Sequence, residues 1–145
     1  MNLKVVSLIA FGVALIGVFY LIDKNYLFSK NPISIIIQAC GVGLMIWSRL
    51  TFGVRSFNAT ANATKGKLVK NGPYHFLRHP IYAALIFFFT ASIISFPFIG
   101  TIAAVFLIVL GLFVRMILEE KSLLVAYGDY AEYSKKTKRI IPFVF

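Results

Sequence analysis

The sequence is poor in acidic residues and in side chains that bind metals. It has five Asp and Glu residues against 15 Lys and Arg, with one cysteine and two histidines among 145 residues. The single cysteine, Cys40, excludes a disulfide within the chain. Structural zinc sites take their ligands mostly from Cys and His, and these are too few here to favour one. We therefore expect neither a disulfide framework nor a metal centre.

Long polar stretches are also scarce. Hydrophobic residues make up 59% of the chain, and its mean hydropathy is +0.84. A soluble domain of this length could not bury so much apolar surface, so the composition predicts one integral-membrane domain over residues 1–145, with membrane lipids as partners. The net charge of +10 is then better explained by basic loops beside an anionic membrane face than by a nucleic-acid partner.

Four apolar runs stand out along the chain: residues 3–22, 32–50, 81–96 and 98–118. A helix of about 20 residues is needed to cross the hydrocarbon of a bilayer. The first, second and fourth runs are long enough, whereas the third is short unless its helix begins near Pro80. Pro97 separates the last two runs and predicts a tight hairpin. The pattern therefore predicts an all-α membrane bundle of about four transmembrane helices.

Basic residues mark the side of the membrane. Lys and Arg are frequent between residues 49 and 78 and again from residue 115, whereas the first loop and the turn near Pro97 carry few or none. The positive-inside rule then predicts that both termini are cytoplasmic. The chain divides into two N-terminal transmembrane helices (1–50), a cytoplasmic loop (51–80), a transmembrane hairpin (81–118) and a cytoplasmic amphipathic tail (119–145).

The tail has a periodicity of its own. Apolar and aromatic residues recur at near-helical spacing: Leu123, Leu124, Tyr127, Tyr130 and Tyr133. Basic residues follow them. The pattern predicts a C-terminal interfacial helix with aromatic anchors.

Residues 72–82 place titratable groups at the start of the third apolar run. This segment holds both histidines, an arginine and two tyrosines: Tyr74, His75, Arg78, His79 and Tyr82. Pro80 suits the first helical position, which would make His79 the approximate N-cap. The unpaired N–H groups of that first turn form a natural place for an anion. The alternative is that Arg78 snorkels, His79 caps the helix and the tyrosines anchor it.

A second cluster, Arg115, Glu119 and Glu120, ends the last apolar run. Arg115 and Glu119 are four residues apart and share a helix face. They either form an ordinary ion pair at the helix end or hold a bound anion and a bound cation. An arginine this close to hydrocarbon costs a few kcal/mol unless something compensates it, which keeps the second alternative open.

Together the clusters form an ordered motif. It comprises Leu68, Val69, Gly72, Pro73, Tyr74, Arg78, His79, Pro80 and Tyr82, then Arg115, Glu119 and Glu120, then Tyr127, Gly128, Tyr130, Tyr133, Arg139 and Pro142. This order and spacing resembles the isoprenylcysteine carboxyl methyltransferase family, part of a wider group of integral-membrane methyltransferases that includes phospholipid methyltransferases. The resemblance runs from about Phe52 to the C-terminus, and the N-terminal part of the chain offers no match to the pattern.

The resemblance implies that S-adenosyl-L-methionine binds at the cytoplasmic end of the last two helices. The residues it assigns to the cofactor are Lys67, Leu68, Val69, Tyr74, His79, Pro80, Ile81, Tyr82 and Glu119. Arg115 would face the anion of the acceptor, and Arg115, Glu119 and His79 would be the catalytic residues. Arg78 and Glu120 would stand behind these residues and support them.

The chemistry of the acceptor favours one reaction. A carboxylate is already ionised at neutral pH, whereas an alkylammonium must first lose a proton to a base. We therefore expect carboxyl O-methylation of a lipophilic, isoprenylcysteine-like acceptor, either a small molecule or a lipidated one. The alternatives are N-methylation of a phospholipid or amine and S-methylation of a thiol. A small four-helix transporter is disfavoured, because no acidic residue lies mid-membrane. A non-catalytic four-helix membrane protein, which would bind no cofactor, also ranks below the enzymes.

Overall fold

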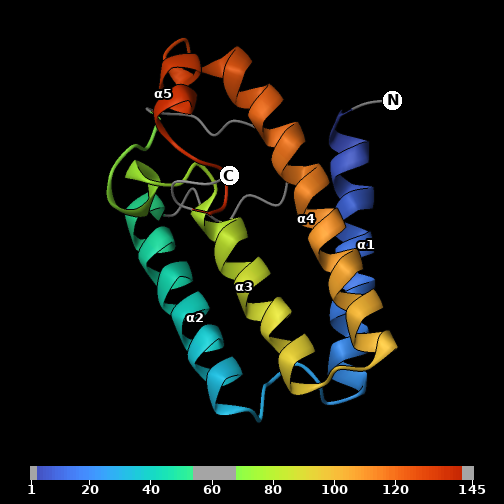
Figure 1. Cartoon of the computed structure of the whole chain (residues 1–145). Coiled ribbons are helices and arrows are strands. Elements are labelled where there is room, and N and C mark those ends of the chain that lie inside the picture. The colour runs from blue at the N-terminus through green and yellow to red at the C-terminus, as the bar shows by residue number, and fades with distance from the viewer. Residues whose placement is uncertain (1–2, 54–67, 142–145) are drawn as a thin grey trace.

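The computed structural model describes residues 3–53 and 68–141, and helices are the main secondary structure in these ranges (Figure 1). Its α-helices are α1 (Leu3–Asp23), α2 (Pro32–Phe52), α3 (Pro80–Ser95), α4 (Ile99–Ala126) and α5 (Tyr130–Lys136), with a short 3₁₀-helix, η2, at Gly72–His75. The only β-type pairing in the described ranges is one isolated bridge. The prediction of an all-α fold is confirmed.

Three of the described helices, α1, α2 and α4, are long and apolar enough to cross a membrane. Helix α3 is equally apolar but has 16 residues, which at about 1.5 Å per residue falls short of the hydrocarbon thickness. Large apolar side chains point away from the protein, including Ile16, Phe19 and Phe106, each more than 60% exposed. Such a surface is stable only against lipid, so the chain is a membrane protein.

The long helices form a row in the order α2, α3, α4, α1 (Figure 1). Helix α1 packs along α4, α2 packs along α3, and the α3–α4 contact joins the two pairs. Helix α5 lies beyond the upper ends of α2 and α3 in the view of Figure 1. The start of α3 and helix α5, which carry much of the predicted motif, therefore lie at the upper ends of the helices in Figure 1.

Helices α1 and α4 touch through small residues. A Cβ atom added to Gly111 would stand 2.4 Å from the carbonyl oxygen of Ala10, and one added to Gly17 would stand 2.4 Å from that of Ala104. Close backbone approach of this kind is the usual way in which membrane helices gain packing energy, because lipid removes the hydrophobic drive between them. The contact fixes which residues of α1 face which residues of α4.

The start of α3 follows the sequence prediction. Gly72 has φ +57°, a left-handed conformation that glycine adopts without strain, and it opens the η2 turn. His79 is the N-cap of α3 and Pro80 occupies its first turn, as predicted. At the other end, only residues 96–98 separate α3 from α4, which confirms a tight hairpin around Pro97.

The C-terminal part differs from the prediction in two respects. Helix α4 continues to Ala126 instead of ending with the apolar run near residue 118, because Glu and Lys stop an apolar run but favour a helix. The periodic tail is thus divided between α4 and α5. Tyr130 and Tyr133 of α5 are 2% and 7% exposed, so they pack inside the protein instead of anchoring a helix at the membrane surface.

Candidate active site

The C-terminal segment docks against the start of α3. Leu77 and Lys138 form a parallel bridge. The Arg78 N–H donates to the Lys138 carbonyl at 2.7 Å, and the His79 N–H donates to the Arg139 carbonyl at 3.1 Å. Residues 138 and 139 therefore hold the backbone of the Arg-His-Pro sequence from outside the helix.

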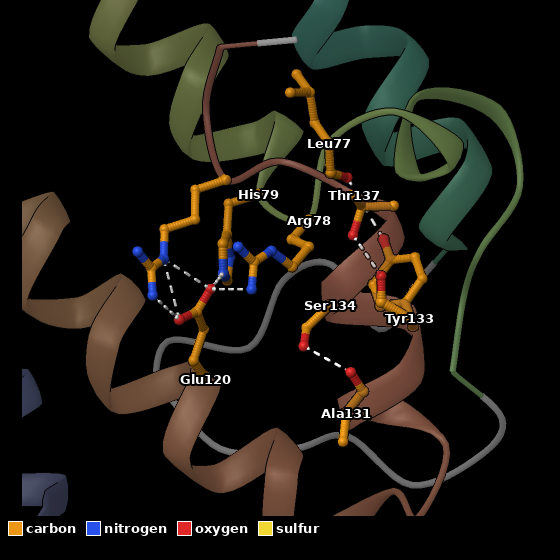
Figure 2. A network of polar contacts seen from close by, with 9 residues as sticks. Leu77, Arg78, His79, Glu120, Ala131, Tyr133, Ser134 and Thr137 are labelled. Carbon is orange, nitrogen blue, oxygen red and sulfur yellow. Dashed lines mark hydrogen bonds and ion pairs between the residues drawn. The ribbon is translucent and has the colours of Figure 1, made fainter. Parts of the chain in front are cut away.

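The Glu120 carboxylate is the centre of a charged cluster (Figure 2). Arg139 donates to it from Nε at 3.1 Å to each oxygen and from Nη2 at 3.0 Å. Arg78 Nη1 lies 3.2 Å and His79 Nε2 lies 3.3 Å from Oε1. The Glu120 side chain is 10% exposed. This position suits the supporting role expected of Glu120 and Arg78, since the carboxylate fixes the imidazole that stands at the helix start.

Positive charge exceeds negative charge in this cluster. One carboxylate faces two guanidinium groups, Arg78 and Arg139, and the His79 ring. Among the described residues, Nε of Arg78 is buried without a hydrogen-bond partner. A buried donor left unsatisfied is costly, so a site with one is suited to an added acceptor. The cluster can hold a further anion.

The first turn of α3 adds donors at the same place. Pro80 has no N–H, and the N–H of Ala83 donates to the His79 carbonyl at 2.9 Å. The amides of Ile81 and Tyr82 come before that bond and have no intrahelical acceptor. They carry the positive end of the helix dipole. The predicted anion position at the start of α3 is therefore present as a group of backbone donors.

Tyr82 links the two clusters of the motif. Its hydroxyl accepts from the Arg115 guanidinium and donates to the Glu119 carboxylate. Its ring centre lies 5.6 Å from that of His79. Residues about 35 positions apart in the sequence thus meet on the facing sides of α3 and α4. The structure brings His79, Tyr82, Arg115 and Glu119 into one continuous group.

Arg115 is buried despite its charge. It is 7% exposed, and its guanidinium lies over the ring of Phe11 on α1, 5.1 Å from the ring centre. Phe11 lies outside the sequence motif. Only the packing of α1 on α4 reveals this contact.

Tyr74 is held by Tyr133 of α5. The Tyr133 hydroxyl donates to the Tyr74 carbonyl at 2.6 Å, and the Tyr74 ring packs against Phe52 at 5.4 Å between centres. Burial raises the pKa of the Tyr133 hydroxyl to about 12, and it raises the pKa of Tyr74 well above its ordinary value. Both hydroxyls therefore remain protonated at neutral pH.

The remaining predicted positions are less informative. Leu68 and Val69 are half-buried in the segment before η2, and Lys67 lies outside the described residues. Arg139 was present in the motif without a role, although the structure places it beside Glu120. Within the described ranges, no group of three or more His, Cys, Asp and Glu residues could hold a metal ion.

Comparisons with known proteins give one match. A family model described as phospholipid methyltransferase matches residues 29–130, which is more than half of the chain. The match includes α2, α3 and α4 and leaves out α1 and the residues after 130. Comparisons with curated proteins and with solved structures give no significant match.

Proposed function

The chain belongs to the phospholipid methyltransferase family and is a membrane methyltransferase, and from this premise we propose that it transfers a methyl group from S-adenosyl-L-methionine to a lipophilic acceptor. In this proposal the whole chain is one domain, both termini are cytoplasmic, and the site lies at the inner face of the membrane. The observation that carries the proposal is the meeting of His79, Tyr82, Arg115 and Glu119 between α3 and α4.

The residues present fit the cofactor. S-adenosyl-L-methionine supplies a reactive methyl group on a sulfonium cation and carries a carboxylate. Arg78 Nε and the first-turn amides of α3 are donors suited to a carboxylate. Glu119 supplies negative charge beside Tyr82, which suits a cation. The apolar contacts would come from the other predicted positions: Lys67 (its alkyl stem), Leu68, Val69, Tyr74, Pro80 and Ile81.

Arg115 would bind the acceptor through its anionic group. A buried guanidinium binds a carboxylate strongly, because both partners are charged and the surroundings exclude water. A fixed acceptor and a fixed donor give the alignment that displacement at a methyl carbon requires. Arg115 thus positions the acceptor and takes no proton from it.

The positions of the histidines favour a carboxylate acceptor. His79 Nε2 is turned to Glu120, and His75 is exposed with its ring edge-on to Phe76. One imidazole is thus engaged by a carboxylate, and the other lies on the exposed side of the η2 turn. A carboxylate needs no base at neutral pH, whereas an ammonium acceptor does. Carboxyl O-methylation of an isoprenylcysteine-like acceptor is therefore our first candidate.

The family match itself favours a second candidate, N-methylation of a phospholipid. In that reaction Arg115 would bind the phosphate of the headgroup, and Glu119 would face the amine. The two candidates share one arrangement of charge, anion at Arg115 and cation near Glu119, and differ in whether a proton must leave first. The chemical nature of the methylated product distinguishes the two candidates.

The product can be identified by its stability in alkali. The purified protein is incubated with methyl-labelled S-adenosyl-L-methionine and either N-acetyl-S-farnesylcysteine or phosphatidylethanolamine vesicles. A methyl ester releases volatile labelled methanol in base, whereas an N-methyl or S-methyl product keeps the label. We expect base-labile label on the farnesylcysteine. Stable label on phosphatidylethanolamine would establish the second candidate, and absence of cofactor binding would overturn the proposal.

The role of Arg115 is tested by Arg115→Ala, with Arg115→Lys as a partial replacement. Loss of a charged hydrogen bond should raise the acceptor KM about ten-fold or more, and lysine should recover part of it. The dissociation constant of the cofactor, measured by calorimetry, should stay within about two-fold because Arg115 faces the acceptor. An acceptor KM and turnover equal to those of the wild type would show that the role is wrong.

A further inference from the structure

Helix α1 has a fixed register on α4. A Cβ on Gly111 would lie 2.4 Å from the Ala10 carbonyl oxygen and 2.9 Å from the Ala14 Cβ, whereas Gly17 faces Ala104. Rising numbers on α1 therefore meet falling numbers on α4, so the two helices are antiparallel. Because the backbones touch, neither helix can slide without a clash. The positions next to this contact are determined as firmly as the contact itself.

The register brings Phe11 to Arg115. Side chains of a helix lean toward its N-terminus, so in an antiparallel pair the Phe11 and Arg115 side chains lean toward each other. The ring centre lies 5.1 Å from the guanidinium carbon, within the range of a cation–π contact. Phe11 is 40% exposed and Arg115 is 7% exposed. The ring thus stands between the guanidinium and the surrounding lipid.

One helical turn before Phe11 lies Ser7, on the face of α1 that is buried with Ala10 and Ala14. Ser7 is 1% exposed, and its Oγ has no hydrogen-bond partner among the described residues. Ser7 precedes Ala10 by about one turn and Arg115 follows Gly111 by about one turn, which places their Cα atoms at about the same depth. An unsatisfied buried hydroxyl at that depth is suited to a bound acceptor of hydrogen bonds.

We propose that α1 completes the acceptor site. The Ser7 hydroxyl donates a hydrogen bond to the oxyanion that Arg115 binds, and the Phe11 ring orients the guanidinium and forms the wall toward the lipid. The oxyanion is a carboxylate or a phosphate at the polar end of a lipophilic acceptor. This inference rests on the proposed function and adds residues from the helix that the family match leaves out.

Ser7→Ala separates a binding role from a structural one. Removing a buried hydroxyl that has no partner should leave the melting temperature unchanged or raise it. The acceptor KM should nevertheless rise about ten-fold, while the calorimetric dissociation constant of S-adenosyl-L-methionine stays unchanged. The matched control is Ser34→Ala, because Ser34 is also fully buried with an unsatisfied Oγ. Ser34 lies in the first turn of α2, which does not lie next to α1 in the helix row of Figure 1. This substitution should change neither constant.

Phe11 is tested as a positioning residue. Phe11→Leu should raise the acceptor KM about three- to ten-fold with turnover at saturation nearly unchanged, and Phe11→Tyr should restore it, because the aromatic face is what the guanidinium contacts. Phe19→Leu, two turns further along α1 and 66% exposed, is the control and should have no effect. Kinetics with N-acetyl-S-farnesylcysteine and with phosphatidylethanolamine vesicles distinguish a carboxylate from a phosphate.

The outcomes separate this inference from the proposed function. If the wild type methylates either acceptor and Ser7→Ala and Phe11→Leu keep its KM, α1 has no part in acceptor binding and only this inference is wrong. If the wild type binds the cofactor but methylates neither, the acceptor class fails and this inference fails with it. If it binds no cofactor, the proposed function is wrong as well.

Discussion

The Glu120 cluster gives the sharpest test of how the site is held together. Glu120→Gln keeps the size of the side chain and removes its charge. We expect this substitution to lower the free energy of unfolding by about 3 kcal/mol and to weaken binding of S-adenosyl-L-methionine. The amide cannot accept from two guanidinium groups with both of its terminal atoms, so Arg78 and Arg139 would face each other without compensation.

The magnitude follows from the burial and the contacts. Glu120 is 10% exposed and receives Arg139 at 3.0 and 3.1 Å and Arg78 at 3.2 Å. Breaking a buried ion pair by removing one partner costs about 3–5 kcal/mol. The Arg139 side chain is 31% exposed, so water can solvate it after the substitution. We therefore take the lower end of that range.

The assay is thermal or denaturant unfolding of the detergent-solubilised protein, with Glu132→Gln as the matched control. Glu132 pairs with Lys136, but both side chains are more than 70% exposed, and so exposed an ion pair adds little to stability. A double-mutant cycle with Arg139→Gln should give a coupling energy of about 1.5–3 kcal/mol with Glu120. If Glu120→Gln and Glu132→Gln destabilise the protein equally, the cluster does not hold the site.

Two further predictions concern the packing around the site. Gly111→Ala should destabilise the protein by about 1–3 kcal/mol in the same unfolding assay, because the added Cβ would lie 2.4 Å from the Ala10 carbonyl oxygen. Gly12→Ala is the control and should be neutral or stabilising, because a Cβ at that position meets nothing within 4 Å. Tyr133→Phe should cost about 1 kcal/mol, because the hydrogen bond to the Tyr74 carbonyl is lost. Burial raises the pKa of Tyr133 from about 10 to about 12, so its neutral form stabilises the fold fully below pH 10 and that stabilisation is lost as the pH rises toward 12. The difference between Tyr133→Phe and wild type should therefore be constant from pH 6 to pH 9, and a difference that disappears within that interval would contradict the assignment.

Features set by local chemistry were predictable from the sequence. Pro80 has a fixed φ and no N–H, so His79 could be identified as the N-cap before any packing was known. The hairpin at Pro97 follows from the same property. The end of α4 was not predictable from hydropathy, because Glu119 and Glu120 interrupt the apolar run without interrupting the helix.

Contacts between segments that are distant in the sequence were harder to predict. The meeting of Arg115 and Glu119 with Tyr82 was expected only from the family resemblance, since spacing alone places the first two on one helix face. The role of Arg139 had a usable signal, because the chain has five acidic residues for 15 basic ones and an acid inside the motif must attract the nearest cations. Phe11 had no such signal, because the sequence does not distinguish an aromatic residue that contacts a charged group from one that faces lipid.

The two segments outside the family match act on opposite sides of the proposed site. Residues 138 and 139 hold the His79 backbone and the Glu120 carboxylate, which belong to the cofactor side. Helix α1 contacts Arg115, which belongs to the acceptor side. In the proposed function the Glu120 cluster supports the cofactor, whereas Arg115 binds the acceptor. On that proposal, substitutions at Phe11, which contacts Arg115, would change acceptor binding and leave the residues around Glu120 in place.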